Sequence, residues 1–175
     1  MILDDLKKEF SSKYSLVKIT ESILNDVFEI MKQNIYFISR TQPHDITMEE
    51  CREDIYALPP NTDLSQKFYL AFYKDNECIG LLDYIEGYPT SDVVYLGLFI
   101  LSPRYQGAGV GSNIISKFVN CVRKNGFKEI KLACFESNEV GHAFWKHMEF
   151  TEEKVSTREN DGRIYNLIHM HKVLN

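Results

Sequence analysis

Residues 93–112 read VVYLGLFILSPRYQGAGVGS. The segment up to Leu101 is apolar, β-branched and aromatic, which is typical of a strand buried on both faces. Pro103 ends that strand, and glycines follow at the alternate positions 107, 109 and 111. Apolar residues then recur at helical spacing over residues 113–122. The segment therefore predicts a strand, a glycine loop and a helix, in that order.

This order of elements favours the binding of an anion. A helix N-terminus presents unpaired N–H groups and a partial positive charge. Glycines let the backbone approach a phosphate closely because they carry no Cβ. A turn that only joins a strand to a helix does not need three glycines. The loop is thus predicted to hold a phosphorylated cofactor.

The spacing of the glycines separates the candidate cofactors. A P-loop needs a Lys after its last glycine, and here Ser112 and Asn113 follow Gly111. The dinucleotide pattern counted from Gly107 fails at its sixth place, which is Ser112. The pattern that fits is Gln-x-x-Gly-x-Gly, formed by Gln106, Gly109 and Gly111.

This pattern resembles motif A of the GNAT superfamily of N-acetyltransferases, in which the loop binds the pyrophosphate of acetyl-coenzyme A. The strand end and the proline that precede the loop match that family as well. The resemblance implies that acetyl-CoA is the cofactor and that the strand end and the loop contact it. The residues implied are Phe99, Ile100, Leu101, Gln106, Gly107, Ala108, Gly109, Val110, Gly111 and Ser112.

Residues 136–150 resemble the second cofactor motif of the same family. Asn138 matches the family pattern; it can cap a helix and donate its amide to the pantetheine arm. Trp145 occupies the place usually held by Tyr, and Glu149 the place usually held by Gly. Asn138 and Trp145 are predicted to bind the cofactor. The alternatives, that Asn138 is only a cap and Trp145 only a core residue, stay open.

The resemblance implies direct attack of an amine on the thioester. Some relatives place a Glu base where this chain has Tyr95, which makes Tyr95 the candidate catalytic residue. A phenol can orient an amine or relay its proton, but it is a poor base near neutral pH, and Tyr95 could equally be a buried aromatic residue. Asp83, Glu86 and Asp92 are candidate remote bases acting through water. Gly97 within the strand indicates a bulge or a close ligand approach.

Trp145 also affects the expected mechanism. In the family the Tyr at this place is thought to protonate the departing thiolate. An indole N–H cannot give up its proton near neutral pH. A thiol with a pKa of roughly 8.5 leaves tolerably well as a thiolate. The substitution therefore leaves the general acid unassigned without excluding acetyl transfer.

The whole chain fits one domain, residues 1–175, with 44% hydrophobic and 26% charged residues. A net charge of −5 does not favour nucleic acid or an anionic membrane as a partner. No apolar run approaches the roughly 20 residues of a membrane span, and the acidic start is unlike a signal peptide, so a cytoplasmic location is expected. The four cysteines form no CxxC pair, and no metal site is predicted. A monomer or a homodimer is expected.

Strand and helix patterns alternate along the rest of the chain. They predict an antiparallel hairpin before the central strand and crossover helices after it, hence a mixed α/β sheet. The predicted strands are 16–19, 67–73, 78–85, 93–101, 130–135, 150–157 and 163–172, with helices over 23–37, 47–58, 113–122 and 138–148. This is the GNAT order, and the resemblance implies a mostly antiparallel sheet of six to seven strands, splayed at its centre and flanked by about four helices.

The function predicted is transfer of an acetyl group from acetyl-CoA to a primary amine of a small molecule or peptide. One alternative is a catalytically silent acyl-CoA-binding module, supported by Trp145 and by the missing Glu base. A dinucleotide-dependent oxidoreductase is disfavoured by the failed glycine spacing.

Overall fold

The computed structural model describes residues 1–175 and contains one seven-stranded sheet in the order β1-β2-β3-β4-β5-β7-β6. Neighbouring strands are antiparallel except β4 and β5, which are parallel. The predicted mixed α/β fold is therefore confirmed. The elements are α1 (Ile2–Phe10), β1 (Ser15–Lys18), α2 (Leu24–Gln33), α3 (Ile35–Thr41), α4 (Met48–Tyr56), β2 (Lys67–Lys74), β3 (Glu77–Glu86), β4 (Val93–Leu101), α5 (Val110–Lys124), β5 (Glu129–Phe135), α6 (Glu139–His147), β6 (Thr151–Asn160) and β7 (Arg163–Val173), with short 3-10 turns at Glu21–Ile23 and Pro103–Tyr105.

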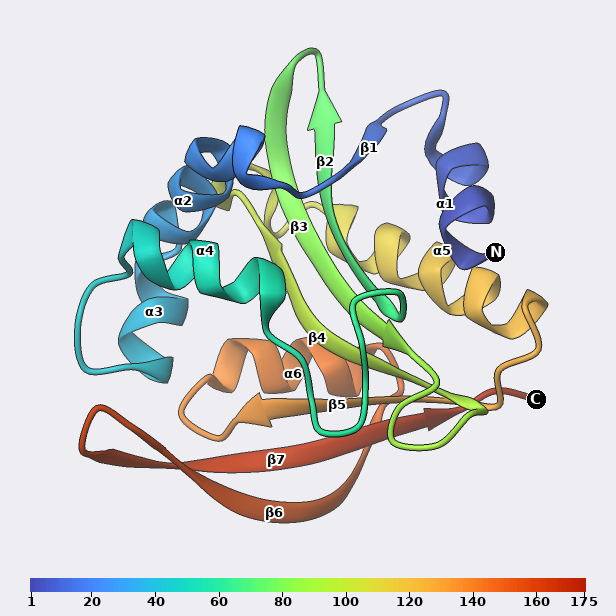
Figure 1. The fold of residues 1–175 in the computed structure, drawn as a ribbon. Coiled ribbons are helices and arrows are strands. Elements are labelled where there is room, and N and C mark those ends of the chain that lie inside the picture. The colour runs from blue at the N-terminus through green and yellow to red at the C-terminus, as the bar shows by residue number, and fades with distance from the viewer.

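Helices cover both faces of the sheet (Figure 1). Alternate side chains of a strand point to opposite faces, and β2 shows this clearly. Leu70 and Phe72 belong to the core shared with α1, α5 and α6, whereas Tyr69 and Ala71 belong to the core shared with α2, α3 and α4. Two apolar cores, one on each face, thus fix the position of the central strands.

Local sequence signals explain several element boundaries. Thr47 and Glu50 form the reciprocal hydrogen bonds of a capping box at the start of α4. The β6–β7 turn has positive φ at both central residues, +48° at Asp161 and +79° at Gly162, as a type I′ turn requires. The β2–β3 turn has positive φ at Asp75 and Asn76 as well, so turn chemistry sets the pairing next to the turn in both hairpins.

The helices differ from the prediction in two places. The segment predicted as one helix to residue 37 forms α2 and α3, which break at Asn34. Asn34 is only 7% exposed, and its side-chain amide donates to the carbonyls of Ile30 and Leu101 instead of pointing to solvent. In addition, α1 buries three apolar side chains under α5. The count is therefore six α-helices, not about four.

The central strand also differs from the prediction. Its two ends are buried as expected, but Gly97 is exposed and Leu98 and Phe99 are only half-buried. The pattern indicated burial on both faces. That was wrong for these three residues, where β4 loses its neighbour β5, and also for Tyr95, which is half-buried. No helix of the structure is both long and apolar enough to cross a membrane.

Candidate functional site

The two parallel central strands separate halfway along their length. β4 and β5 pair only over Val93–Leu96 and Glu129–Leu132. On the other side of β4 the register with β3 shifts so that Gly97 is an extra, bulged residue between the pairs Asp83–Leu98 and Tyr84–Leu96. The predicted splay and bulge are therefore present. Together they leave the β5-facing edge of β4 without a strand partner beyond Leu96.

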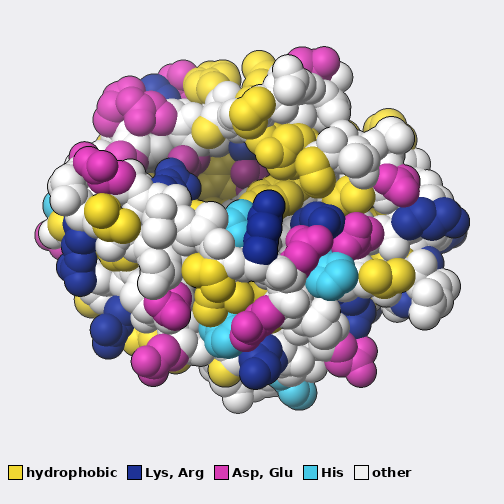
Figure 2. Space-filling model, turned by 90° about the horizontal axis from the view of Figure 1, so that it is seen from below, with side chains coloured by type: hydrophobic (Ala, Val, Ile, Leu, Met, Phe, Trp, Pro, Cys, Tyr) yellow, Lys and Arg dark blue, Asp and Glu magenta, His cyan; other side chains and the backbone are white.

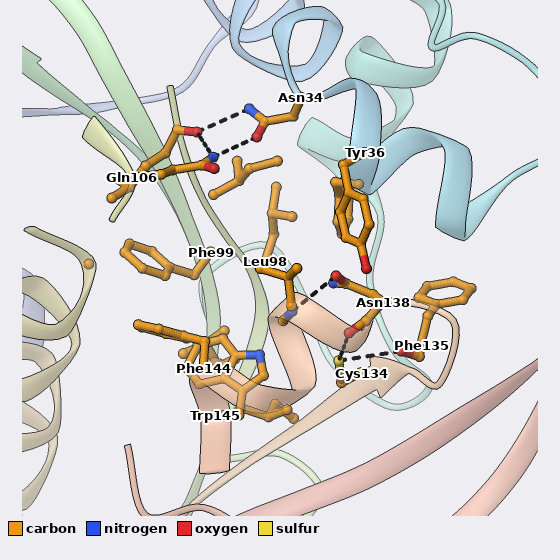
Figure 3. Close-up of a pocket in the computed structure, with 18 of the residues that line it drawn as sticks. Asn34, Tyr36, Leu98, Phe99, Gln106, Cys134, Phe135, Asn138, Phe144 and Trp145 are labelled. Carbon is orange, nitrogen blue, oxygen red and sulfur yellow. Dashed lines mark hydrogen bonds between the residues drawn. The ribbon is translucent and has the colours of Figure 1, made fainter. Parts of the chain in front are cut away.

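A cavity of about 550 Å³ occupies this gap. In Figure 3, Phe99, Phe144 and Trp145 lie on one side of it and Tyr36 and Phe135 on the other. Ten of the twelve residues predicted to bind the cofactor line this cavity, whereas Ala108 and Val110 do not. The ten are Phe99, Ile100, Leu101, Gln106, Gly107, Gly109, Gly111, Ser112, Asn138 and Trp145.

The glycine loop delivers the N-terminus of α5 to the edge of this cavity. Gly107 and Gly109 have φ of +78° and +79°, which side chains rarely allow. Gly109 is the N-cap of α5 and offers no side-chain cap, so the first N–H groups of the helix keep their capacity to bind an anion. A Cβ on Gly111 would lie 3.5 Å from atoms of both Phe99 and Phe144.

The side chain of Gln106 holds the loop against the strand. Its amide nitrogen donates to the carbonyl of Leu101 and to Oδ1 of Asn34, both at 2.8 Å (Figure 3). Asn34 in turn donates to the same Leu101 carbonyl at 3.1 Å. This network fixes the strand end, the loop and the α2–α3 break together. A contact between Gln106 and the cofactor stays a prediction.

Asn138 is confirmed as a helix cap. Its Oδ1 accepts a hydrogen bond from the backbone N–H of Gly141 at 3.0 Å. A Cβ on Gly141 would come within 2.3 Å of the Asn138 amide nitrogen, so a larger residue there would require the Asn138 side chain to shift. Glu149, which replaces the family's usual Gly, has φ of +63°, a conformation that explains why glycine suits that place. The contact of Asn138 with a pantetheine arm stays a prediction.

Trp145 belongs to the core and to the cavity wall at once. It is 8% exposed, and its ring centroid lies 4.9 Å from that of Phe144, 5.3 Å from Phe150 and 6.4 Å from Phe99. Its indole N–H makes no hydrogen bond within the protein. Most of the Trp145 side chain is therefore covered by its aromatic neighbours. Because the residue also lines the cavity, its contact with the cofactor stays a prediction.

A second cavity of about 580 Å³ adjoins the first. Both are lined by Phe37, Gly97, Leu98, Ala133 and Phe135, so they meet at the bulge and the splay. Figure 2 shows the molecule hollowed on the face viewed from below, with an apolar floor and charged side chains around it. Tyr95 lines this second cavity rather than the first.

Of the three candidate remote bases, only Asp83 lines the second cavity; Glu86 and Asp92 lie elsewhere. Asp83 accepts a hydrogen bond from the ammonium of Lys67 at 2.8 Å. The side chain of Lys67 is 4% exposed and that of Asp83 is 17% exposed. Burial raises the pKa of Asp83 even though Lys67 opposes the shift. Its second oxygen, Oδ1, has no hydrogen-bond partner, and neither has the hydroxyl of Tyr69 in the same cavity wall.

Contacts between distant segments close one edge of the second cavity. His44, in the loop before α4, lies 2.6 Å from a carboxylate oxygen of Asp161 in the β6–β7 turn. Asn160 donates to the carbonyl of Thr41 at 2.8 Å. The carbonyl of Asp45 and the carboxylate of Asp161 raise the pKa of His44, which strengthens this contact below neutral pH. The β6–β7 hairpin is thereby tied to the α3–α4 loop.

A family model described as the acetyltransferase (GNAT) family matches residues 26–150. The chain belongs to the GNAT family of acetyltransferases. Its fold is similar to that of an acetyltransferase from Thermus thermophilus, at 17% identity and a TM-score of 0.72 over 93% of this chain and 97% of the other. It is similar also to an acetyltransferase from Salmonella typhimurium that modifies the N-terminal serine of a 50S ribosomal subunit protein (15% identity, TM-score 0.72, 94% and 96% covered).

A ribosomal-protein-alanine N-acetyltransferase from Brucella melitensis shares the fold at 15% identity and a TM-score of 0.65, with 91% of this chain and 99% of the other covered. No curated protein matches the sequence. At these identities the solved structures show the common fold, and the family model carries the assignment.

Sequence reasoning missed three residues that shape the two cavities. Asn34 gave no motif, and the only sign of it is a polar residue on the apolar face of a predicted helix. Lys67 begins a strand, where an inward-pointing lysine is rare. Asp54 lies in α4, and no motif in that part of the sequence singles it out. All three precede the glycine loop in the sequence and belong to other elements than the strand and helix beside it.

Proposed function

We propose that this GNAT family member transfers the acetyl group of acetyl-CoA to a primary amine, either the α-amino group of a peptide or the amino group of a small molecule. The observation that carries the proposal is the meeting of two cavities at the bulged, splayed centre of the sheet. One cavity holds the glycine loop and the helix N-terminus, and the other is lined by charged groups. A cofactor and an acceptor can therefore approach one point from opposite sides.

The first cavity suits acetyl-CoA. The N-terminus of α5 would bind the pyrophosphate, because its N–H groups and the positive-φ glycines accept an anion closely. The pantetheine arm would lie along the β5-facing edge of β4, whose backbone groups have no strand partner beyond Leu96. The thioester carbonyl would then meet backbone N–H groups near Gly97, which can stabilise the oxyanion of a tetrahedral intermediate.

The second cavity suits a positively charged acceptor. Its lining includes five carboxylates, of Glu50, Glu53, Asp54, Asp83 and Asp161, against the permanent cations Lys67 and Arg158. An ammonium group is therefore attracted into it. The Salmonella and Brucella enzymes of similar fold are named for modifying an N-terminal serine and a ribosomal-protein alanine. A peptide N-terminus is the acceptor that we test first.

The test is consumption of acetyl-CoA against a panel of acceptors: short peptides, the same peptides with a blocked α-amine, free amino acids, polyamines and aminoglycosides. We expect turnover with unblocked peptides and loss of turnover on blocking. Binding of coenzyme A without turnover on any amine would instead identify a silent acyl-CoA-binding module. Absence of coenzyme A binding would contradict the proposal altogether.

Tyr95→Phe is expected to lower kcat/KM by roughly three- to twelve-fold, which corresponds to one hydrogen bond of about 0.5–1.5 kcal/mol. Burial raises the pKa of Tyr95, so the phenol stays protonated near neutral pH and is not available to take a proton. The shape of the pH profile should not change. A loss of about 10²-fold or more together with a lost inflection would instead make Tyr95 the base.

Trp145→Phe is expected to lower kcat only a few-fold, and Trp145→Tyr to keep or raise it. The indole N–H has no partner within the protein and cannot protonate a thiolate. The affinity for coenzyme A, measured by calorimetry, controls for damage to the cavity wall. If Trp145→Phe lost several hundredfold in kcat at unchanged affinity, the indole would have a direct part in the chemistry.

A further inference from the structure

Two carboxylates that line the second cavity, those of Glu53 and Asp54, make no hydrogen bond or ion pair within the protein. Asp54 lies on α4, lines the cavity, and makes no hydrogen bond or ion pair. Its side chain is exposed to the cavity, and the protein around it desolvates the carboxylate enough to raise its pKa. A carboxylate in this position has the capacity to accept both a hydrogen bond and a proton.

The other titratable groups near the bulge are already occupied or are unsuited to take a proton. Asp83 is paired with Lys67 at 2.8 Å. Glu50 accepts the capping hydrogen bond from the backbone N–H of Thr47. The phenol of Tyr95 is less readily ionised than in water. The imidazole Nε2 of His169 shares a hydrogen bond with the hydroxyl of Ser156 at 2.6 Å. Of the two unpaired carboxylates, Asp54 is the one whose pKa burial raises, so we take Asp54 as the candidate base.

A chain of neighbours links Asp54 to the place where the two cavities meet. A Cβ on Gly97 would lie 3.1 Å from Oδ2 of Asp83, which is the oxygen that bonds Lys67. Lys67 and Asp83 both act electrostatically on Asp54. The unpartnered hydroxyl of Tyr69, a residue 3% exposed, lies in the same wall. Asp54, Lys67, Asp83 and Tyr69 therefore line the same cavity, which also reaches the bulge at Gly97.

We propose that Asp54 binds the ammonium group of the acceptor and takes its proton before the amine attacks the thioester. The proposal rests on the proposed acetyl transfer and names the base for it. In the step, the carboxylate gains one proton and the ammonium becomes a neutral amine. The amine nitrogen bonds to the thioester carbon, the C–S bond breaks, the second proton leaves with the thiolate of coenzyme A, and Asp54 returns its proton to solvent.

The charges around Asp54 set the pH at which it acts. Burial raises its pKa to about 6, and the carboxylates of Asp83 and Glu50 add to the rise, whereas Lys67 and Arg158 oppose it. Asp54 is therefore mostly ionised at pH 7 and close enough to neutrality to exchange a proton readily. The proton transfer is less uphill from an α-amino group, whose pKa is about 8, than from an alkylamine, whose pKa is about 10. The site thus favours α-amines.

The experiment compares wild type, Asp54→Asn, Asp54→Glu and the control Glu49→Gln over pH 5–9, with an unblocked peptide as acceptor. Glu49 is an exposed carboxylate of the same helix that does not line the cavity. Asp54→Asn should lose about 10²–10⁴-fold in kcat/KM at pH 7. It should also lose the acid-limb inflection near pH 6. Its deficit should shrink about tenfold per pH unit toward pH 8, because the amine then arrives already neutral. Asp54→Glu should keep the acid limb, and Glu49→Gln should behave as wild type.

Two further readouts separate this proposal from the function on which it rests. The affinity of Asp54→Asn for coenzyme A should equal that of wild type, and its thermal midpoint should be unchanged or higher because a poorly solvated charge is removed. An Asp54→Asn enzyme that keeps the acid limb, or loses less than about three-fold, overturns the role of Asp54 while acetyl transfer by the wild type stands. A wild type that transfers no acetyl group overturns both.

Discussion

Gly111→Trp is expected to raise the dissociation constant for coenzyme A by at least about a hundredfold, or about 2.7 kcal/mol. Gly111 lies in the first turn of α5 and, unlike Gly107 and Gly109, has no positive φ, so a side chain there is not strained. The direction of its Cβ is toward Phe99 and Phe144, at 3.5 Å from atoms of each. An indole would therefore enter the cavity where the cofactor is proposed to lie.

The control is Ser116→Trp, which places the same bulk on the exposed side of the same helix. That variant should bind coenzyme A as wild type does, and both should keep the native circular dichroism spectrum. Gly109→Trp gives a second, less clean test because its φ of +79° adds backbone strain. If binding survives bulky residues at both positions, the pyrophosphate lies elsewhere on the protein.

The fold was predictable because its signals are local and agree with one another. The glycine loop, the capping box at Thr47 and the turn at Asp161–Gly162 each fix an element boundary within a few residues of sequence. Apolar periodicity then gives the type of most elements. The same logic located the first cavity, because strand end, loop and helix N-terminus are consecutive in the chain.

The second cavity was not predictable in this way, because its walls come from segments far apart in the sequence. Lys67 and Asp83 are brought together by a hairpin register, and His44 meets Asp161 across 117 residues. Asp54 joins them only through the packing of α4 on the sheet. The exposure of Gly97 is of the same kind, because it depends on where β5 leaves β4 and not on the composition of β4.

Lys67→Met is expected to lower the free energy of unfolding by about 3–5 kcal/mol at pH 8, because removing one partner of a buried ion pair leaves the other charge uncompensated. Lys67 is 4% exposed and its ammonium lies 2.8 Å from Asp83, so methionine keeps the bulk of the side chain and removes only the charge and its hydrogen bond. Urea denaturation monitored by circular dichroism measures the loss.

The pH dependence of this loss of stability shows whether the ionised carboxylate of Asp83 causes it. Burial already raises the pKa of Asp83 in the folded protein, and loss of Lys67 should raise that pKa further. A carboxyl whose folded-state pKa lies above its unfolded value of about 3.9 destabilises the fold when ionised. The penalty should therefore be complete above the folded-state pKa and disappear as the pH falls toward about 4.

The double variant Lys67→Met/Asp83→Asn should recover most of the stability and should lose the extra pH dependence, because neither charge remains buried alone. Equal losses for Lys67→Met at pH 5 and pH 8 would show that packing around the lysine stem, and not the charge of Asp83, is responsible. In that event the charges of Lys67 and Asp83 would contribute little to stability. The attraction of an ammonium group would then rest on Asp54 and its neighbours on α4 alone.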